Sequence, residues 1–217
     1  MRRMNDAEID NRTSNSRVSR RTLMLAVAFL GFMVFVALAA RVWHQLGPLR
    51  FDRRVQARLP STDAGGRRIL RYLSYPGGPL AVGLECAALA ALAWWQTRRV
   101  RVVTFCAVAP IVVSLVAELV LKPVIERRTA SGTGLFFPSG HSTGVTSVAT
   151  AAWLACVSLW RSRIARIAGA ALLSAVVVAV GVSRVMLHAH YASDVIGASF
   201  YAVAATLALA AIWLPSR

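Results

Sequence analysis

Six long apolar stretches constrain the fold of this chain more than any other feature of its sequence. A helix needs about 20 predominantly apolar residues to cross the hydrocarbon core of a bilayer. The stretches that approach this length are residues 22–42, 79–96, 102–121, 141–160, 165–183 and 195–214. The composition agrees with a membrane protein, because 57% of the 217 residues are hydrophobic and only 16% are charged. We therefore predict an all-α fold, a bundle of six transmembrane helices that forms one membrane domain over residues 22–217.

The segment that precedes the first apolar stretch is polar and basic. Residues 1–21 contain six arginines, three carboxylates and few large apolar side chains, so we expect a cytoplasmic tail outside the membrane domain. A cleaved signal peptide is the alternative interpretation. We favour a retained transmembrane helix, because the apolar run that follows is longer than a signal core and lacks a clear small-residue cleavage site.

The distribution of arginine predicts an orientation in the membrane. Short loops rich in Arg and Lys usually remain in the cytoplasm, and in a six-span chain the basic segments that share one side are residues 1–21, 97–101 and 161–166. We therefore expect a multi-pass protein of the cell membrane, with the outer or periplasmic side formed by residues 43–78, 122–140 and 184–194. The net charge of +16 fits such basic flanks, whereas nucleic-acid binding does not suit a chain this apolar.

The outer loop 43–78 is rich in arginine as well. Two of its pieces, residues 48–59 and 67–75, mix arginine with large apolar side chains. We expect them to form short amphipathic helices that lie flat in the headgroup region. The alternative is that these arginines gather anionic lipid near a pocket.

A histidine and a carboxylate stand at the start of the last apolar stretch. Asp194 is the only acidic residue after Glu126, and a charge at the mouth of an apolar span usually has a function. If a helix begins near His190, Asp194 lies one turn later on the same face. A carboxylate there can accept the proton of one imidazole nitrogen and leave the other nitrogen free to attack. His190 is therefore a candidate nucleophile, and Asp194 is the candidate residue that orients it.

The start of the fourth apolar stretch has the features of an anion site. Ser139 and Gly140 open this predicted helix, where free backbone N–H groups and the helix dipole favour a bound anion. The next residue, His141, is placed to protonate a leaving oxygen. The cationic side chains that could neutralise a bound phosphate are Lys122, Arg128 and Arg184.

These residues resemble the motifs of the type 2 phosphatidic acid phosphatases (PAP2), a superfamily of membrane lipid phosphatases that also includes soluble vanadium haloperoxidases. The family's middle motif, Pro-Ser-Gly-His, is intact at residues 138–141, and its third motif, Ser-Arg followed by His and Asp, is intact at residues 183–194. The resemblance implies a six-span membrane architecture and a phosphohistidine intermediate on His190 that water hydrolyses. It implies that His141 serves as the proton donor.

The first motif departs from the family pattern. The family has Lys, six residues and then Arg-Pro, whereas Lys122 is followed at these positions by Thr129 and Ala130. Because a loop can shift by one residue, Arg128 is the first candidate for the missing phosphate contact and Arg127 is the second.

The function that these patterns favour is an integral membrane phosphatase that needs neither metal nor cofactor. We expect it to act at the outer membrane face on a lipid phosphate. The candidate substrates are phosphatidic acid, phosphatidylglycerophosphate and a polyprenyl phosphate or diphosphate. The alternatives are a phosphotransferase that uses the same site and a non-catalytic lipid-binding or scaffold protein. The natural lipid and the oligomeric state stay open.

Overall fold

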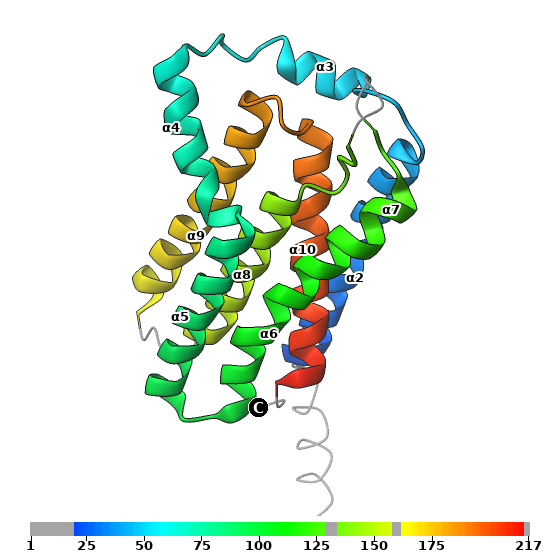
Figure 1. Ribbon diagram of the computed structural model, residues 1–217. Coiled ribbons are helices and arrows are strands. Elements are labelled where there is room, and N and C mark those ends of the chain that lie inside the picture. Colours follow the sequence, from blue (N-terminus) through cyan, green and yellow to red (C-terminus); the bar gives the residue numbers. More distant parts are fainter. Residues whose placement is uncertain (1–19, 129–133, 158–161, 215–217) are drawn as a thin grey trace, which may run out of the picture.

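The apolar stretches form long helices that run side by side, as Figure 1 shows. The computed structural model describes residues 20–128, 134–157 and 162–214, so almost all of the predicted tail lies outside the described residues. The long helices are α2 (Arg20–Val42), α5 (Pro79–Thr97), α6 (Val100–Val116), α8 (Gly140–Cys156), α9 (Arg163–Met186) and α10 (Ala192–Trp213).

Five helical segments of the described chain are long and apolar enough to cross a membrane. They are Arg20–Val42, Pro79–Thr97, Val100–Ile125, Arg163–Met186 and Ala192–Trp213. The sixth predicted stretch, 141–160, forms α8, which has 17 helical residues and ends shortly before the undescribed residues 158–161. The all-α bundle is therefore confirmed with five candidate spans, and the six-span topology stays a prediction.

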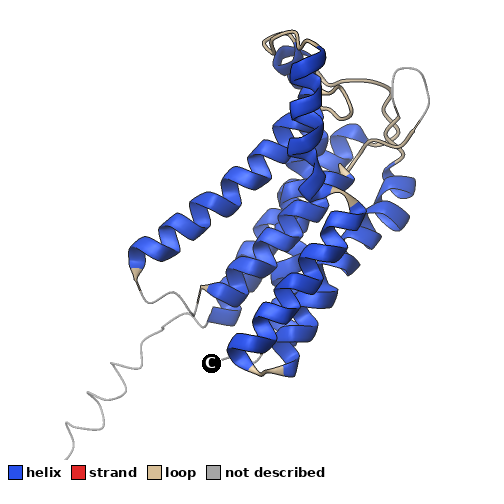
Figure 2. Cartoon of the chain, turned by 60° about the vertical axis from the view of Figure 1, so that its left-hand side comes forward, coloured by secondary structure: helices blue, strands red, loops and turns tan. Residues whose placement is uncertain are grey.

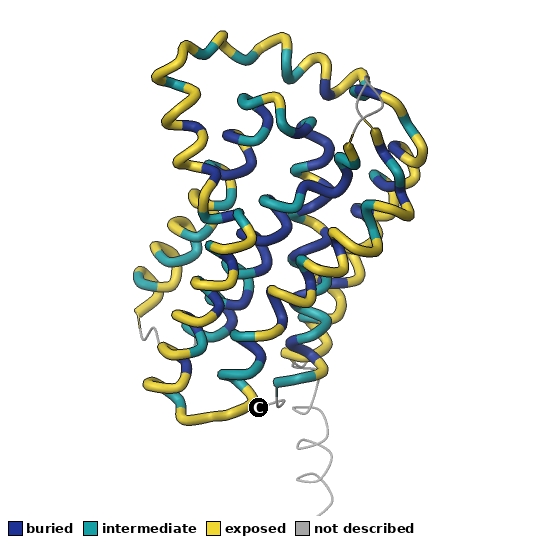
Figure 3. Tube along the Cα trace, in the orientation of Figure 1, coloured by how far each residue is buried: buried dark blue, intermediate teal, exposed yellow. Residues whose placement is uncertain are grey.

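Helix α8 lies among the other helices and contacts α5, α6, α9 and α10. Small residues allow this close packing, because an added Cβ on Gly144 would approach Val82 Cγ2 to 2.7 Å. Its hydroxyl groups bond within the helix: Thr143 donates to the Ser139 carbonyl at 2.9 Å, and Ser147 donates to the Gly144 carbonyl at 2.8 Å. Figure 3 shows that buried residues concentrate along these inner helix faces, while many outward faces are exposed.

The connections between the helices lie at the two ends of the bundle (Figure 2). The start of α2, the turn between α5 and α6, the start of α9 and the end of α10 share one end (Figure 1). This grouping agrees with the basic segments that the sequence assigned to one side. The orientation itself, with that side in the cytoplasm, stays a prediction.

The arginine-rich outer loop contains two short helices, as the sequence predicts. They are α3 (Arg50–Gln56) and α4 (Ala64–Ser74), and a 3₁₀ turn, η1 (Tyr75–Gly77), joins α4 to α5. Asp63 begins α4 by accepting a hydrogen bond from Gly66 N at 2.7 Å. Figure 1 shows α3 across the end of the bundle, but α4 rises nearly in line with α5 and packs against α9. The expected flat orientation therefore does not apply to α4, because its contacts are with another helix.

Phe137 holds the segment that enters α8. Its side chain is fully buried, and its ring stacks on Phe35 of α2 with a centroid separation of 5.6 Å. Gly197 of α10 leaves the room for it, because an added Cβ there would come within 2.4 Å of the Phe137 ring. The start of α8 is thus fixed between α2 and α10.

Candidate active site

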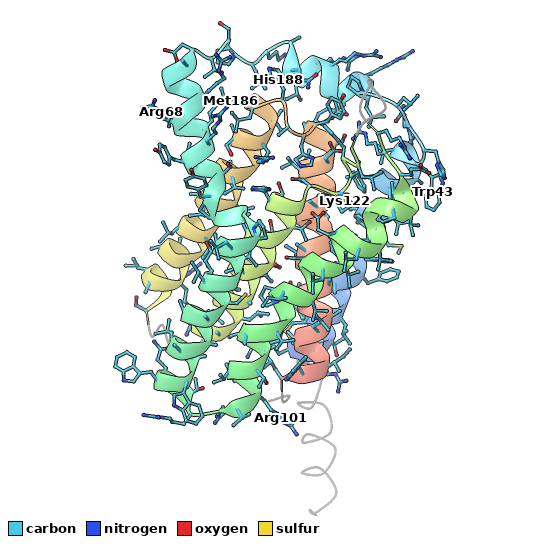
Figure 4. All side chains as sticks on the ribbon, viewed as in Figure 1. Trp43, Arg68, Arg101, Lys122, Met186 and His188 are labelled. Atoms are coloured by element: carbon cyan, nitrogen blue, oxygen red, sulfur yellow. The ribbon has the colours of Figure 1, made fainter. Side chains whose placement is uncertain are left out.

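The predicted site residues gather at the end of the bundle opposite the turn between α5 and α6. Helix α6 continues through a π-helical turn (Ala117–Leu121) into α7 (Lys122–Ile125), which brings Lys122 to this end. Figure 4 shows Lys122 and His188 at this end and Arg101 at the other. The start of α8 and the loop from α9 to α10 lie at the same end, as Figure 1 shows.

Ser139 caps α8 and is hydrogen-bonded to Asp194, so it joins the Pro-Ser-Gly-His segment to the start of α10. Its hydroxyl oxygen accepts from Ser142 N at 3.5 Å, and its carbonyl accepts from Thr143 N at 2.9 Å. Its own N–H donates to the backbone carbonyl of Asp194 at 3.3 Å. The first-turn N–H groups of a helix have no partner within the helix and suit an anion. The start of α8 is therefore fixed against α10 with its N–H groups directed away from the helix body.

A lysine and a glutamate lie directly over the start of α8. Lys122 Nζ donates to Glu118 Oε2 at 2.8 Å, as the spacing of four residues predicts. An added Cβ on Gly140 would lie 2.0 Å from Glu118 Oε1 and 3.6 Å from Lys122 Nζ. The Glu118 carboxylate thus occupies space beside the helix end where an anion would bind, and only glycine at position 140 admits it.

His141 is the second residue of α8 and lies among the predicted site residues. The charges of Arg184, His190 and Lys122 all act on its imidazole. Its backbone packs against Gly77 of η1, where an added Cβ would meet the His141 carbonyl oxygen at 2.4 Å. Residues from separate parts of the chain, η1 and the start of α8, therefore pack together at His141.

His190 and Asp194 face each other at the start of α10. Their closest atoms, His190 Nδ1 and Asp194 Oδ2, are 3.8 Å apart, which is longer than a hydrogen bond. Nδ1 is buried and has no hydrogen-bond partner among the described residues. Asp194 is fully buried, and its Oδ2 accepts from Tyr191 N at 2.8 Å. The pair has the predicted arrangement, with a gap that a small movement of the ring would close.

Arg184 joins this cluster from the end of α9. Its backbone carbonyl accepts from the N–H groups of Ala189 and His190 at 3.0 and 3.2 Å, so it also holds the loop that carries the histidine. Its Nε is buried and has no hydrogen-bond partner within the described chain. A buried guanidinium nitrogen without a partner is suited to an incoming anion.

Arg127 and Arg128, the two candidates for the missing first-motif arginine, are both paired with carboxylates. Arg127 is fully buried and donates to both Asp52 and Asp194, behind the carboxylate that faces His190. Arg128 is 45% exposed and bonds to Glu126. Each guanidinium is thus engaged by a carboxylate, and a phosphate contact from either arginine stays a prediction.

Glu126 forms a small exposed network beside the site. Its carboxylate bonds to Arg128 and lies 3.1 Å from His44 Nδ1. The hydrogen bond from Arg128 and the charge of Arg128 hold the pKa of Glu126 below its usual value, and His44 adds to the effect. Lys122 pairs with Glu118 instead.

Sequence reasoning missed Asp52 and Ser193 as parts of this site. Ser193 N donates to Asp52 Oδ1 at 2.8 Å, although the two residues are 141 positions apart in the chain. The signal available in the sequence was weak: Asp52 is a single carboxylate within an arginine-rich loop. Among the described residues, no group of three or more His, Cys, Asp or Glu side chains is placed to hold a metal ion.

Comparison with known proteins identifies the fold. A sequence profile described as the PAP2 superfamily matches residues 118–216, which include every predicted site residue. The chain is similar to the crystal structure of a transmembrane PAP2-type phosphatidylglycerolphosphate phosphatase from Bacillus subtilis, with a TM-score of 0.66 and 18% sequence identity. The match covers 85% of this chain and 94% of the other. A comparison with curated proteins found no match.

Proposed function

We propose that this chain is a membrane enzyme of the PAP2 superfamily, whose profile matches its C-terminal half, and that it hydrolyses the phosphomonoester or diphosphate of a lipid at the outer membrane face. One observation carries the proposal: at the N-terminus of α8, directly before His141, Lys122 Nζ lies beside Gly140, where an added Cβ would be 3.6 Å from it. Two cations, a helix N-terminus and two imidazoles are the groups that phosphoryl transfer without a metal requires.

The proposed reaction has two steps on one phosphorus atom. Lys122, Arg184 and the first N–H groups of α8 hold the phosphate oxygens. The free nitrogen of His190 attacks phosphorus, the bond from phosphorus to the leaving oxygen breaks, and His141 donates a proton to that oxygen. Water, deprotonated by His141, then attacks the phosphohistidine, releases phosphate and restores His190.

The arrangement of polar and apolar atoms supports a lipid substrate. A groove of about 780 Å³ between α2, α8, α9 and α10 is lined mainly by apolar side chains. Its lining on α8 begins at Thr146, five residues beyond His141, and continues to Val157, which is about 16 Å along the helix at 1.5 Å per residue. An acyl or prenyl chain in this groove would leave its phosphate near the start of α8.

The test is phosphate release by the purified full-length chain in detergent. The lipids to compare are phosphatidylglycerophosphate, which the name of the similar Bacillus subtilis protein suggests first, phosphatidic acid, and polyprenyl phosphate and diphosphate. Release without an added acceptor distinguishes a hydrolase from a phosphotransferase. We expect EDTA to leave the rate unchanged; a loss that added metal restores would contradict a mechanism without metal.

The decisive variant is His190→Gln. We expect it to lower kcat on the order of 10⁴-fold or more, the usual cost of removing a nucleophile. The matched control is His188→Asn, because His188 lies in the same loop, is exposed and has a φ of 54° that Asn tolerates. Unchanged phosphate release in the His190→Gln variant would favour a protein that binds lipid without catalysis.

A further inference from the structure

Three fully buried charged side chains from distant parts of the chain form one network behind the site. They are Asp52 of α3, Arg127 of the segment after α7, and Asp194 of α10, and none has measurable exposure. Buried charges are costly unless they are paired and hydrogen-bonded. Of these three residues, only Asp194 has a predicted role, which is to orient His190. The burial of Asp52 and Arg127 therefore needs another explanation.

Arg127 bridges the two carboxylates. Its Nη1 donates to Asp194 Oδ1 and, at 2.8 Å, to Ser193 Oγ. Its Nη2 donates to Asp52 Oδ2 at 2.8 Å and to the Gly47 carbonyl at 3.2 Å. A planar guanidinium can make these contacts at once in a fixed geometry, which a lysine ammonium cannot.

Asp52 fixes the other side of the network. Its Oδ1 accepts from Ser193 N, and its Oδ2 accepts from Ser193 Oγ, each at 2.8 Å. Its Oδ2 also accepts from Leu49 N at 3.0 Å, which holds the carboxylate at the start of α3. Asp52 therefore holds both Arg127 and the residue that directly precedes Asp194.

These contacts determine which oxygen of Asp194 faces the nucleophile. Oδ1 is engaged by Arg127, and Oδ2 is the oxygen near His190 Nδ1. Rotation of the carboxylate would break its bonds to Arg127 and to Tyr191 N. We propose that Arg127, itself held by Asp52, is a positioning residue that presents Asp194 Oδ2 to His190, so that the outer helix α3 helps to orient the nucleophile.

The inference rests on the proposed function and predicts an effect on turnover. Within the described chain, no hydrogen bond or ion pair joins the proposed phosphate contacts Lys122 and Arg184 to the three charged residues of this network, so substrate binding should change little. Asp52→Asn keeps the acceptor oxygen and leaves Arg127 paired with Asp194, and Arg127→Lys keeps the positive charge. We expect each variant to lower kcat by about tenfold to 100-fold, the usual range for residues that orient a functional ligand, with KM nearly unchanged.

The controls are the same chemical changes outside the network. Asp63→Asn alters an exposed cap of α4 in the same loop, and Arg53→Lys alters an exposed arginine of α3. Thermal unfolding in detergent shows whether each variant is folded. In an Asp194→Asn background, Asp52→Asn should cost no further activity, because its effect passes through Asp194.

The outcomes separate the two proposals. If wild-type protein releases phosphate and folded Asp52→Asn and Arg127→Lys variants keep the wild-type kcat, the positioning role is wrong and the proposed function stands. An additional loss in the Asp194→Asn background would also overturn the positioning role, since it shows a path that bypasses Asp194. If wild-type protein releases no phosphate from any lipid of the panel, the proposed function fails and this inference fails with it.

Discussion

The contact between Gly77 and His141 gives a sharp test of how tightly the site is held. An added Cβ on Gly77 would lie 2.4 Å from the His141 carbonyl oxygen, 2.8 Å from its carbonyl carbon and 2.9 Å from its Cα. All three atoms are backbone, so no side-chain rotation relieves the clash. Ordinary contact begins near 3.4 Å, so the Gly77→Ala substitution requires the two backbones to separate by about 1 Å.

This displacement is expected to reduce catalysis more than folding. The start of α8 would carry His141 and its N–H groups away from η1 and so shift them relative to the rest of the site, and a misplacement of about 1 Å can cost about 100-fold in rate. We therefore expect kcat/KM of Gly77→Ala to fall about 100-fold, which corresponds to about 2.7 kcal/mol of transition-state stabilisation. The assay is phosphate release in detergent, with thermal unfolding measured on the same samples.

The matched control lies six residues further along the chain. An added Cβ on Gly83 of α5 meets nothing within 4 Å, and alanine in a helix interior is more stable than glycine by about 0.5–1 kcal/mol. Gly83→Ala should therefore keep full activity and unfold at the same or a higher temperature. A folded Gly77→Ala variant with activity within threefold of wild type would refute the view that η1 fixes His141.

Two further predictions concern the carboxylates beside the site. Glu118→Gln removes a negative charge that competes with phosphate for Lys122, so we expect KM for a lipid phosphate to fall several-fold; an increase in KM would show that Glu118 instead supports substrate binding. Because the folded-state pKa of Glu126 is lowered, its stabilisation is present above the unfolded-state pKa and is lost as pH falls through the folded-state pKa. The difference in unfolding temperature between wild type and Glu126→Gln should therefore be present at neutral pH and disappear in acid, and a difference independent of pH would contradict this.

The sequence predicted the helices because apolar length is a local property. The apolar stretch 22–42 predicts a helix, which forms as Arg20–Val42, and the stretch 165–183 predicts one that forms as Arg163–Met186. The stretch 102–121 predicts a third, whose helical segment in the structure continues to Ile125 through the π-helical turn. Hydropathy could not predict that turn, since it changes the hydrogen-bond pattern and not the composition.

The candidate site was predictable only where its chemistry is local. His190 and Asp194 are four residues apart, and Ser139, Gly140 and His141 are consecutive, so their proximity follows from helix geometry. The partners of Arg127 are 75 and 67 residues away in the chain. No spacing in a single sequence reveals such pairs, so the loop alone does not predict the partners of Arg127.

The position that departs from the family's first motif lies two residues from the arginine of the buried network. The arginine that the family pattern places on the phosphate is absent at position 129, and the nearby Arg127 bonds to Asp194 instead. Among the described residues, the cations that act on His141 are then Lys122 and Arg184, which match the two negative charges of a phosphate monoester. A third cation therefore acts on the orientation of the nucleophile and not on the charge of the substrate. Changes at Asp52 of α3 should for this reason alter kcat, whereas changes at Lys122 or Arg184 should alter KM as well.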